Sequence, residues 1–288
     1  MKNNRDMMSE LIGFAQNDER IRLVTLEGSR TNKNIPPDPF QDYDLSYFVT
    51  DMDSFKEHDR WLQRFGNIAM MQKPEDMELF PSELGNWYSY LILFEDGNKL
   101  DLTLIPVTET EDYFRQSDGL VEVLLDKDAR VNHEVVANDR HYWVKQPTAR
   151  AFDDACNEFW MTSTYVVKGL MRKEILFAID HLHEIARPNL LRMMAWHIGA
   201  EHGYQVSMGK NYKFLQRYLP KADWEALLST YSQHGYEEMW NALFLSYSLF
   251  RTYSEAVAKR FGYPYPPYDE AITKYTEDLY MKRNSTRS

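Results

Sequence analysis

Two aspartates at the start of a predicted strand form the pattern with the clearest chemical meaning in this sequence. Asp42 and Asp44 flank Tyr43 at the beginning of a strand expected over Tyr43–Thr50. Because side chains alternate faces along a strand, the two carboxylates share one face, about 7 Å apart. Like charges on one face repel each other, and a hard cation such as Mg²⁺, which prefers oxygen ligands, would reverse that repulsion. The spacing therefore predicts a metal site.

A glycine-serine pair lies upstream of these aspartates. Gly28-Ser29 follows a strand predicted over Ile21–Leu26 and precedes the proline-rich loop Thr31–Gln41. Backbone N–H groups and a hydroxyl in such a turn can hold phosphate, and Arg30 is either a further phosphate contact or a partner in a structural ion pair. A phosphate-holding turn beside metal-binding carboxylates is typical of two-metal phosphoryl or nucleotidyl transfer.

A third aspartate lies on a later strand. Residues 96–98, Asp-Gly-Asn, predict a hairpin turn between strands over Trp87–Phe94 and Leu100–Val107. In the second strand Asp101 and Thr103 alternate with leucines, which places Asp101 on the polar face. If this strand lies beside the strand of the first two aspartates, the three carboxylates converge.

These motifs resemble a known superfamily. Gly-Ser, then 12 residues, then Asp-x-Asp and a later strand aspartate are similar to the nucleotidyltransferases that include DNA polymerase beta. The wider sequence resembles the aminoglycoside 6-adenylyltransferases, which inactivate streptomycin, in the segments GSRTN, PPD, FQDYD, MMQKPEDMELFP, DGNKLDLTLIP, NEFW and LLRMMAWHI. The resemblance covers nearly the whole chain, and these segments in this order are far more specific than Gly-Ser with Asp-x-Asp alone.

The resemblance implies an α+β fold, with a polymerase-beta-like mixed sheet and helices followed by a C-terminal helical bundle that closes over the acceptor. It implies transfer of AMP from MgATP to the 6-hydroxyl of streptomycin, with release of pyrophosphate. Asp42 and Asp44 would hold Mg²⁺ on the triphosphate, and the turn at Gly28 and Ser29 would hold the phosphates. Asp101 would lie near the acceptor hydroxyl as a metal ligand, as the general base, or as both.

The hydrophobic pattern changes near Gln146-Pro147-Thr148 from short strands to long helical repeats. We therefore expect a nucleotidyltransferase domain over residues 1–146 and a helical substrate-binding domain over residues 147–288. The first also contains a predicted helix around residues 7–15, one from Ser54 through Arg64, strands over Ile68–Gln72 and Val121–Leu125, and a short helix over Glu109–Gln116. The second contains predicted helices from Thr148 through Lys173 and over Pro188–Glu201, Tyr212–Tyr218, Asp223–Ser232 and Tyr236–Phe261, and a last helix after residue 268.

Four charged residues of the helix that begins at Thr148 are candidates for substrate contacts. Asp153, Asp154 and Glu158 lie in its first turns, where the helix dipole favours carboxylates whatever their function. Similarity to related adenylyltransferases implies that this helix faces the cleft, which would give one of the three a role in substrate binding. Lys168 is either a contact to the triphosphate or an ordinary exposed lysine.

Composition narrows the possible partners. The net charge of −11 disfavours nucleic acid, whose binding rests on Lys and Arg, and favours a cationic small molecule. The sequence contains no apolar run of about 20 residues, so no membrane span is expected. The single cysteine suits a reducing cytoplasm. No protein partner is implied. Two alternatives remain: a nucleotidyltransferase acting on another small molecule or on nucleic acid, and a non-catalytic nucleotide-binding module.

Overall fold

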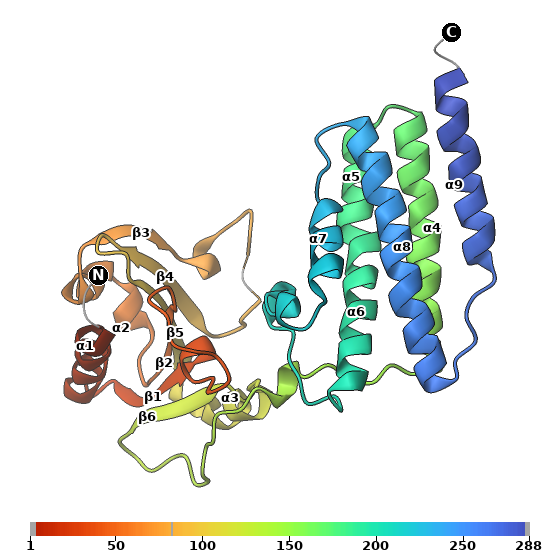
Figure 1. The fold of residues 1–288 in the computed structure, drawn as a ribbon. Coiled ribbons are helices and arrows are strands. Elements are labelled where there is room, and N and C mark those ends of the chain that lie inside the picture. Colours follow the sequence, from red (N-terminus) through yellow and green to blue (C-terminus); the bar gives the residue numbers. More distant parts are fainter. Residues whose placement is uncertain (1–3, 82, 286–288) are drawn as a thin grey trace. The chain divides into compact units, whose positions relative to one another are not determined.

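The computed structural model describes residues 4–81 and 83–285 and has an α+β fold (Figure 1). The chain divides into two compact units, one ending at His141 and one beginning at Tyr142. The first unit contains a six-stranded sheet, and the second is helical. No helix in the described part of the chain is long and apolar enough to cross a membrane.

The sheet of the first unit has the strand order β3-β4-β5-β2-β1-β6. β2 and β5 pair in parallel, and the other neighbouring strands pair antiparallel. The sequence predicted all six strands, whose bounds are β1 Ile21–Glu27, β2 Tyr43–Val49, β3 Ile68–Gln72, β4 Tyr88–Phe94, β5 Lys99–Pro106 and β6 Val121–Asp126.

The two faces of the sheet differ in character. One face packs against helix α1, Asn4–Asn17, and buries alternate residues such as Tyr47, whose hydroxyl donates to the Leu11 carbonyl at 2.8 Å. On the other face, Phe48 packs edge-on against Tyr113 of helix α3, Thr110–Gln116. That apolar cluster covers only part of the face. Asp44 and Asp101 lie beyond it, near the N-terminal ends of β2 and β5.

The helix predicted from Ser54 through Arg64 is wrong. Helix α2 spans only Asp53–Lys56, and the chain continues as a 3₁₀ helix over Asp59–Phe65. Between them His58 adopts an extended backbone, with φ −159° and ψ 143°, which breaks the helical hydrogen bonding. The apolar side chains that suggested one helix are nevertheless buried, because both pieces pack on the same core: Phe55, Leu62 and Phe65.

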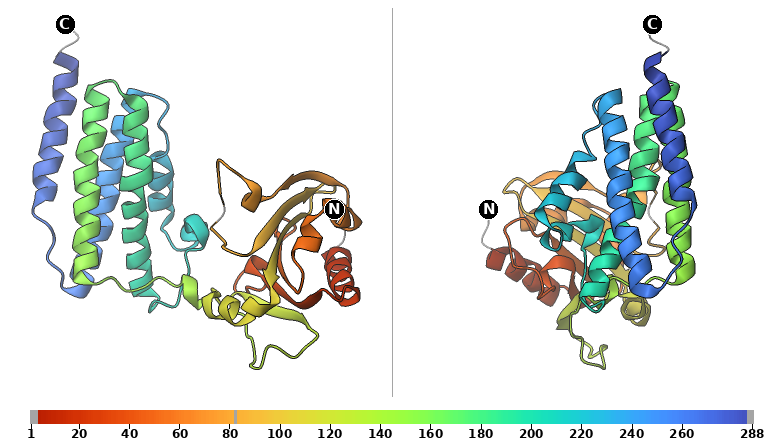
Figure 2. Two further views of the ribbon diagram at one scale, coloured as in Figure 1. Left: turned by 180° about the vertical axis from the view of Figure 1, so that it is seen from behind. Right: turned by 45° about the vertical axis from the view of Figure 1, so that its right-hand side comes forward.

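The second unit consists of helices that run alongside each other in every view, with α4 in contact with α6, α8 and α9, and α6 in contact with α8 (Figure 2). As predicted, Thr148 caps α4, its hydroxyl oxygen accepting from the Ala151 N–H at 3.1 Å. The core between the helices is rich in aromatic residues, and Phe159 stacks on Phe250 at 3.8 Å between ring centroids. The bounds are α4 Ala149–Met171, α5 Ile175–Asp180, α6 Arg187–Glu201, α7 Lys221–Ser229, α8 Tyr236–Phe261 and α9 Tyr268–Ser285.

One helix prediction in this unit is confirmed to within a residue, and another needs correction. Helix α6, Arg187–Glu201, matches the helix predicted over Pro188–Glu201, and α5 precedes it through a π-helical turn over His181–Ala186. Proline lacks the N–H that an α-helix needs, and the wider π turn before it is one way for a helix to absorb that interruption. The predicted helix Tyr212–Tyr218 is replaced by two 3₁₀ turns, since Asn211 and Tyr212 have φ of 54° and 59°, outside the right-handed helical region.

Candidate active site

The sheet register brings carboxylates from three strands into one row. Asp44 of β2 lies directly opposite Glu27 of β1 and directly opposite Asp101 of β5. Residues opposite each other in neighbouring strands point to the same face. Asp42 precedes β2 by one residue, two positions before Asp44. The strand of Asp101 lies beside the strand of the other two aspartates, which meets the condition under which the three carboxylates were expected to converge.

A row of hydroxyl side chains lies next to the row of carboxylates. Thr25, Ser46, Thr103 and Ser89 are opposite one another across β1, β2, β5 and β4. The Ser89 and Thr103 hydroxyls are 3.2 Å apart. On β2 and β5 these small polar side chains separate Asp44 and Asp101 from the apolar cluster around Phe48. Glu27 instead lies next to that cluster, and its carboxyl group is largely buried.

Gly28 is required by both its backbone conformation and its neighbours. It opens a single 3₁₀ turn, Gly28–Arg30, with φ +72°. A Cβ atom at this position would lie 2.6 Å from Asp44 Oδ2. Only glycine therefore allows the turn to approach the carboxylate of Asp44 so closely.

Arg30 ties this turn to the start of β2. Its Nε donates to the Asp42 carbonyl at 2.8 Å, and its Nη2 donates to the Gln41 carbonyl at 2.7 Å. The guanidinium lies 3.8 Å from the centre of the Tyr43 ring. Arg30 thus fixes the backbone that carries Asp42, and a contact from Arg30 to phosphate stays a prediction.

Lys99, which the sequence analysis did not single out, lies between two of the aspartates. Its Nζ donates to Asp42 Oδ2 at 3.0 Å and to Asp101 Oδ2 at 2.8 Å. Burial works against the charged ammonium, but the hydrogen bonds to Asp101 and Asp42 outweigh it and raise the pKa of Lys99. The sequence contained a signal for Lys99. Side chains alternate faces along the strand, so Lys99 shares the polar face with Asp101 while Leu100 points to the opposite face.

The row of carboxylates has more negative charge than its surroundings neutralise. Burial, followed by the charges of Asp101 and Asp42, raises the pKa of Asp44 to about 6. Burial also raises the pKa of Glu27 to about 7, although Glu27 accepts hydrogen bonds from Thr25 and Tyr113. Glu27 is a second residue that the sequence analysis missed, and its position directly before Gly28 is the signal that could have found it.

The donor atoms fit a hard divalent cation. All are carboxylate oxygens, and Asp101 Oδ1 is buried with no hydrogen-bond partner. Within residues 4–81 and 83–285, however, no three His, Cys, Asp or Glu side chains are already gathered closely enough to hold a metal ion. The ammonium of Lys99 is hydrogen-bonded to two of the three aspartates instead. Metal binding by Asp42, Asp44 and Asp101 stays a prediction.

The remaining predicted site residues belong to α4 in the second unit and form a separate group. Asp154 and Glu158 line a cavity of about 700 Å³ that also includes Glu184, Asn189 and Trp196. Asp153, which is also exposed, does not line this cavity.

Lys168 is exposed in the last turn of α4, and its Nζ lies 5.1 Å from the centre of the Tyr165 ring. A cation there is favoured by the helix dipole. The structure thus gives this lysine a local role, and a contact to the triphosphate remains a prediction.

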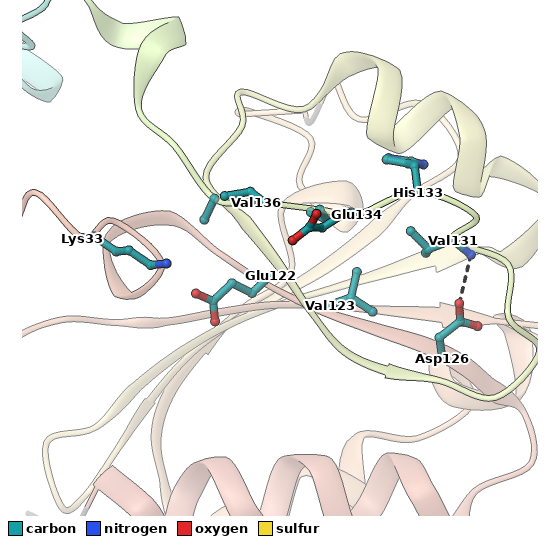
Figure 3. Close-up of a pocket in the computed structure, with 10 residues that line it drawn as sticks. Lys33, Glu122, Val123, Asp126, Val131, His133, Glu134 and Val136 are labelled. Carbon is teal, nitrogen blue, oxygen red and sulfur yellow. Dashed lines mark hydrogen bonds between the residues drawn. The ribbon is translucent and has the colours of Figure 1, made fainter.

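Another cavity, of about 600 Å³, lies beside β6 in the first unit (Figure 3). Lys33 and Glu122 point into it, and the nearby loop is held by the Val131 N–H, which donates to Asp126 Oδ2 at 2.9 Å. None of the predicted site residues lines this cavity.

Comparisons with known proteins show the family of this chain. The sequence profile of the streptomycin adenylyltransferase family matches residues 1–279. The chain belongs to this family. It is therefore an enzyme of the nucleotidyltransferase class, as the resemblance of its motifs implied.

Relatives match over nearly the full length. An aminoglycoside 6-adenylyltransferase of Bacillus subtilis (strain 168) is 70% identical over 280 residues, which cover 97% of this chain and 99% of the relative. An aminoglycoside 6-adenylyltransferase of Campylobacter jejuni is 52% identical over 275 residues, covering 96% and 95% of the two chains. A crystal structure of an aminoglycoside 6-adenyltransferase from Bacillus subtilis matches at 65% identity with a TM-score of 0.48, covering 97% and 99% of the two chains.

Proposed function

We propose that this protein transfers AMP from MgATP to the 6-hydroxyl of streptomycin and releases pyrophosphate. The observation that carries the proposal is the register of β2 and β5, which sets Asp44 opposite Asp101. Beside this pair, the turn at Gly28 approaches Asp44 as closely as a glycine permits. Family membership and the relatives' names support an aminoglycoside as the acceptor.

Each group of the site has a defined part in this proposal. The turn at Gly28 and Ser29 binds phosphate oxygens through N–H groups and a hydroxyl. Asp42 and Asp44 hold Mg²⁺, which when bound neutralises phosphate charge and stabilises the charge that develops during transfer. Asp101 acts on the acceptor side, where it accepts the proton of the 6-hydroxyl, holds a divalent cation together with the other aspartates, or does both. A bond then forms between the oxygen of that hydroxyl and the α-phosphorus, and the bond from the α-phosphorus to the bridging oxygen breaks, with its electron pair leaving on pyrophosphate.

The helical unit supplies carboxylates for a cationic acceptor. Asp154 and Glu158 share a cavity with Glu184, and Trp196 provides an aromatic wall. Guanidinium groups such as those of streptomycin pair with carboxylates and stack on aromatic rings. We therefore assign the recognition of the acceptor's positive charges to this cavity.

The test is mass spectrometry of streptomycin incubated with the enzyme, ATP and Mg²⁺, together with an assay of released pyrophosphate. We expect streptomycin to gain one adenylyl group and pyrophosphate to appear in equal amount. Asp42→Asn and Asp44→Asn should each abolish transfer while the protein stays folded. Asp112→Asn is the matched control, because this exposed aspartate lies on α3 of the same unit and pairs only with Arg115 among the described ion pairs.

Two results would contradict different parts of the proposal. Near-normal turnover of Asp42→Asn or Asp44→Asn at saturating Mg²⁺ would show that the metal assignment is wrong. Unmodified streptomycin, with another aminoglycoside adenylylated under the same conditions, would show that the acceptor is wrong while leaving the nucleotide site intact.

A further inference from the structure

We propose that Lys99 is a built-in counterion, which occupies the position of the divalent cation between Asp42 and Asp101 and leaves when that cation binds. The inference rests on the metal-binding part of the proposed function. It concerns the protein before nucleotide arrives, and it requires neither ATP nor an acceptor.

The contacts of the ammonium carry the first step. Lys99 Nζ lies 3.0 Å from Asp42 Oδ2 and 2.8 Å from Asp101 Oδ2. Asp42 directly precedes β2, and Asp101 lies near the start of β5. Asp42 and Asp101 each adjoin the paired residues Tyr43 and Leu100, so the pairing of β2 with β5 keeps their backbones close whether or not a cation neutralises the carboxylates. Without an ammonium here, nearby like charges would repel each other. The lysine therefore relieves a repulsion that the fold itself creates.

The second step is that the ammonium and a divalent ion exclude each other. Mg²⁺ approaches its oxygen ligands to about 2.0–2.1 Å and demands several of them in a fixed geometry. Lys99 already occupies the Oδ2 atoms of both Asp42 and Asp101. Two cations sharing these oxygens would repel strongly.

The third step is that the lysine is able to leave. Its side chain is 39% exposed, and the side chains of Asp42 and Asp101 are 38% and 27% exposed. A displaced ammonium can thus reach water without crossing a buried layer. Asp101 Oδ1, buried and without a partner, is an additional oxygen for the incoming ion. The arrangement keeps affinity for the bare metal low, so that the ion binds firmly only together with the triphosphate.

The alternative is that Lys99 is only a structural ion pair between neighbouring parts of the sheet. In that case its removal would destabilise the protein and would not improve metal binding. The two roles therefore differ in the sign of the change in metal affinity.

The experiment measures Mn²⁺ binding to the nucleotide-free protein by the electron paramagnetic resonance signal of free Mn²⁺. We expect Lys99→Met to bind Mn²⁺ about tenfold more tightly than the wild type, since it removes a competing charge at contact distance. Lys99→Arg, which keeps the charge, should stay close to the wild type. Lys56→Met is the matched control, because it removes one positive charge from an exposed position of the same unit.

Equal or weaker Mn²⁺ binding by Lys99→Met would overturn the proposal, as would the same gain in Lys56→Met. A second measurement uses the wild type in case the variant does not fold. In protein with ¹³Cε-labelled lysine, the signal missing from Lys99→Arg identifies Lys99, and Mg²⁺ at constant ionic strength should shift it. A Lys99 signal that Mg²⁺ leaves in place would also overturn the proposal. Because no arm uses ATP or streptomycin, failure of the proposed acceptor would not change these results.

Discussion

The two oxygens of Asp101 have different surroundings: Oδ2 accepts a hydrogen bond from Lys99, and Oδ1 is buried without a partner. Replacement by asparagine keeps the shape of the side chain but removes most of its power to accept a proton or hold a cation. Loss of general-base help alone typically costs about 10²–10⁴-fold in rate. We therefore expect Asp101→Asn to lower kcat by at least about a hundredfold, with little change in ATP affinity.

Calorimetric titration with ATP and steady-state turnover with streptomycin measure the two effects of Asp101→Asn separately. If ATP binding collapses while kcat at saturation survives, Asp101 belongs to the nucleotide side of the site. The division of roles between Asp101 and the pair Asp42 and Asp44 would then be reversed.

The raised pKa values of Asp44 and Glu27 predict how stability depends on pH in the metal-free protein. Both carboxyls have folded-state pKa values, about 6 and about 7, above those of ordinary unfolded carboxyls near 4. The folded state therefore binds more protons, and the stability linked to these groups is full below about pH 4 and is lost as pH rises through about 6 to 7. For Asp44 the loss is at most about 3 kcal/mol.

The readout is the difference in thermal midpoint between the wild type and Asp44→Asn, measured with a chelator from pH 4 to pH 8. Asparagine cannot ionise, so the variant should gain stability relative to the wild type as pH rises. Asp112→Asn should show no such trend, because its side chain is exposed. If the difference in thermal midpoint between the wild type and Asp44→Asn does not change with pH, ionisation of Asp44 does not destabilise the folded protein, and the prediction is wrong.

Among the individual site residues, the sequence predicted those whose position follows from the pattern of one strand. It missed those whose position depends on the neighbouring strand. Alternation along β5 placed Asp101 on the polar face, and Asp-x-Asp placed Asp42 and Asp44 together. Glu27 becomes part of the site only because the antiparallel register sets it opposite Asp44. One strand's pattern does not contain that register. Alternation along β5 places Lys99 on the polar face beside Asp101, but its contact with Asp42 depends on the pairing of β2 with β5.

Among the elements, the turn Gly28–Arg30 has the strictest conformational requirement, because it combines positive φ with contact to Asp44. In Gly28→Ala, the left-handed conformation should cost about 1 kcal/mol. The new methyl group would also push the Asp44 carboxylate, which is the movable neighbour. We expect a small loss of thermal stability and a much larger loss of turnover.

Gly85→Ala is the control for Gly28→Ala. Gly85 also has positive φ, +65°, but a Cβ there would have no atom within 4 Å. It should therefore show a similar stability loss with nearly normal turnover. If Gly28→Ala and Gly85→Ala lose turnover equally, the close approach to Asp44 has no special importance.

The elements themselves were predicted where a local pattern decides them. Strands β1 to β6 and the capped start of α4 follow alternation, turn residues and Thr148. The errors occurred where a spaced apolar pattern continues through a change of backbone. His58 interrupts one such pattern, and the positive φ angles of Asn211 and Tyr212 interrupt the helix predicted over Tyr212–Tyr218. Neither backbone change leaves a distinct mark in side-chain hydrophobicity.

For the whole molecule, the dominant electrostatic property is a net charge of −11. The lining of the proposed acceptor cavity has the same sign, because Asp154, Glu158 and Glu184 outnumber the cationic Arg192 among the described residues that line it. Attraction between exposed charges is screened as ionic strength rises. We expect streptomycin affinity to fall by at least about threefold between low salt and 0.5 M salt.

Calorimetric titration of streptomycin over this range of salt measures the effect. Glu158→Gln should lower the affinity at low salt and flatten its dependence on salt, whereas Glu111→Gln, on α3 of the other unit, should behave as the wild type. An affinity that does not change with salt would remove electrostatic attraction from the explanation of acceptor binding.

The pairing of β2 with β5 also determines when during folding the site comes into existence. Asp42 and Lys99 are 57 residues apart in the chain, with β3 and β4 between them. Contacts of such long sequence separation form slowly, because a large loop must close before they contribute. Mg²⁺ would then find its ligands only after the rate-limiting step of folding. Saturating Mg²⁺ should accordingly slow unfolding and leave the refolding rate unchanged, which stopped-flow measurements of both rates with and without the ion would show.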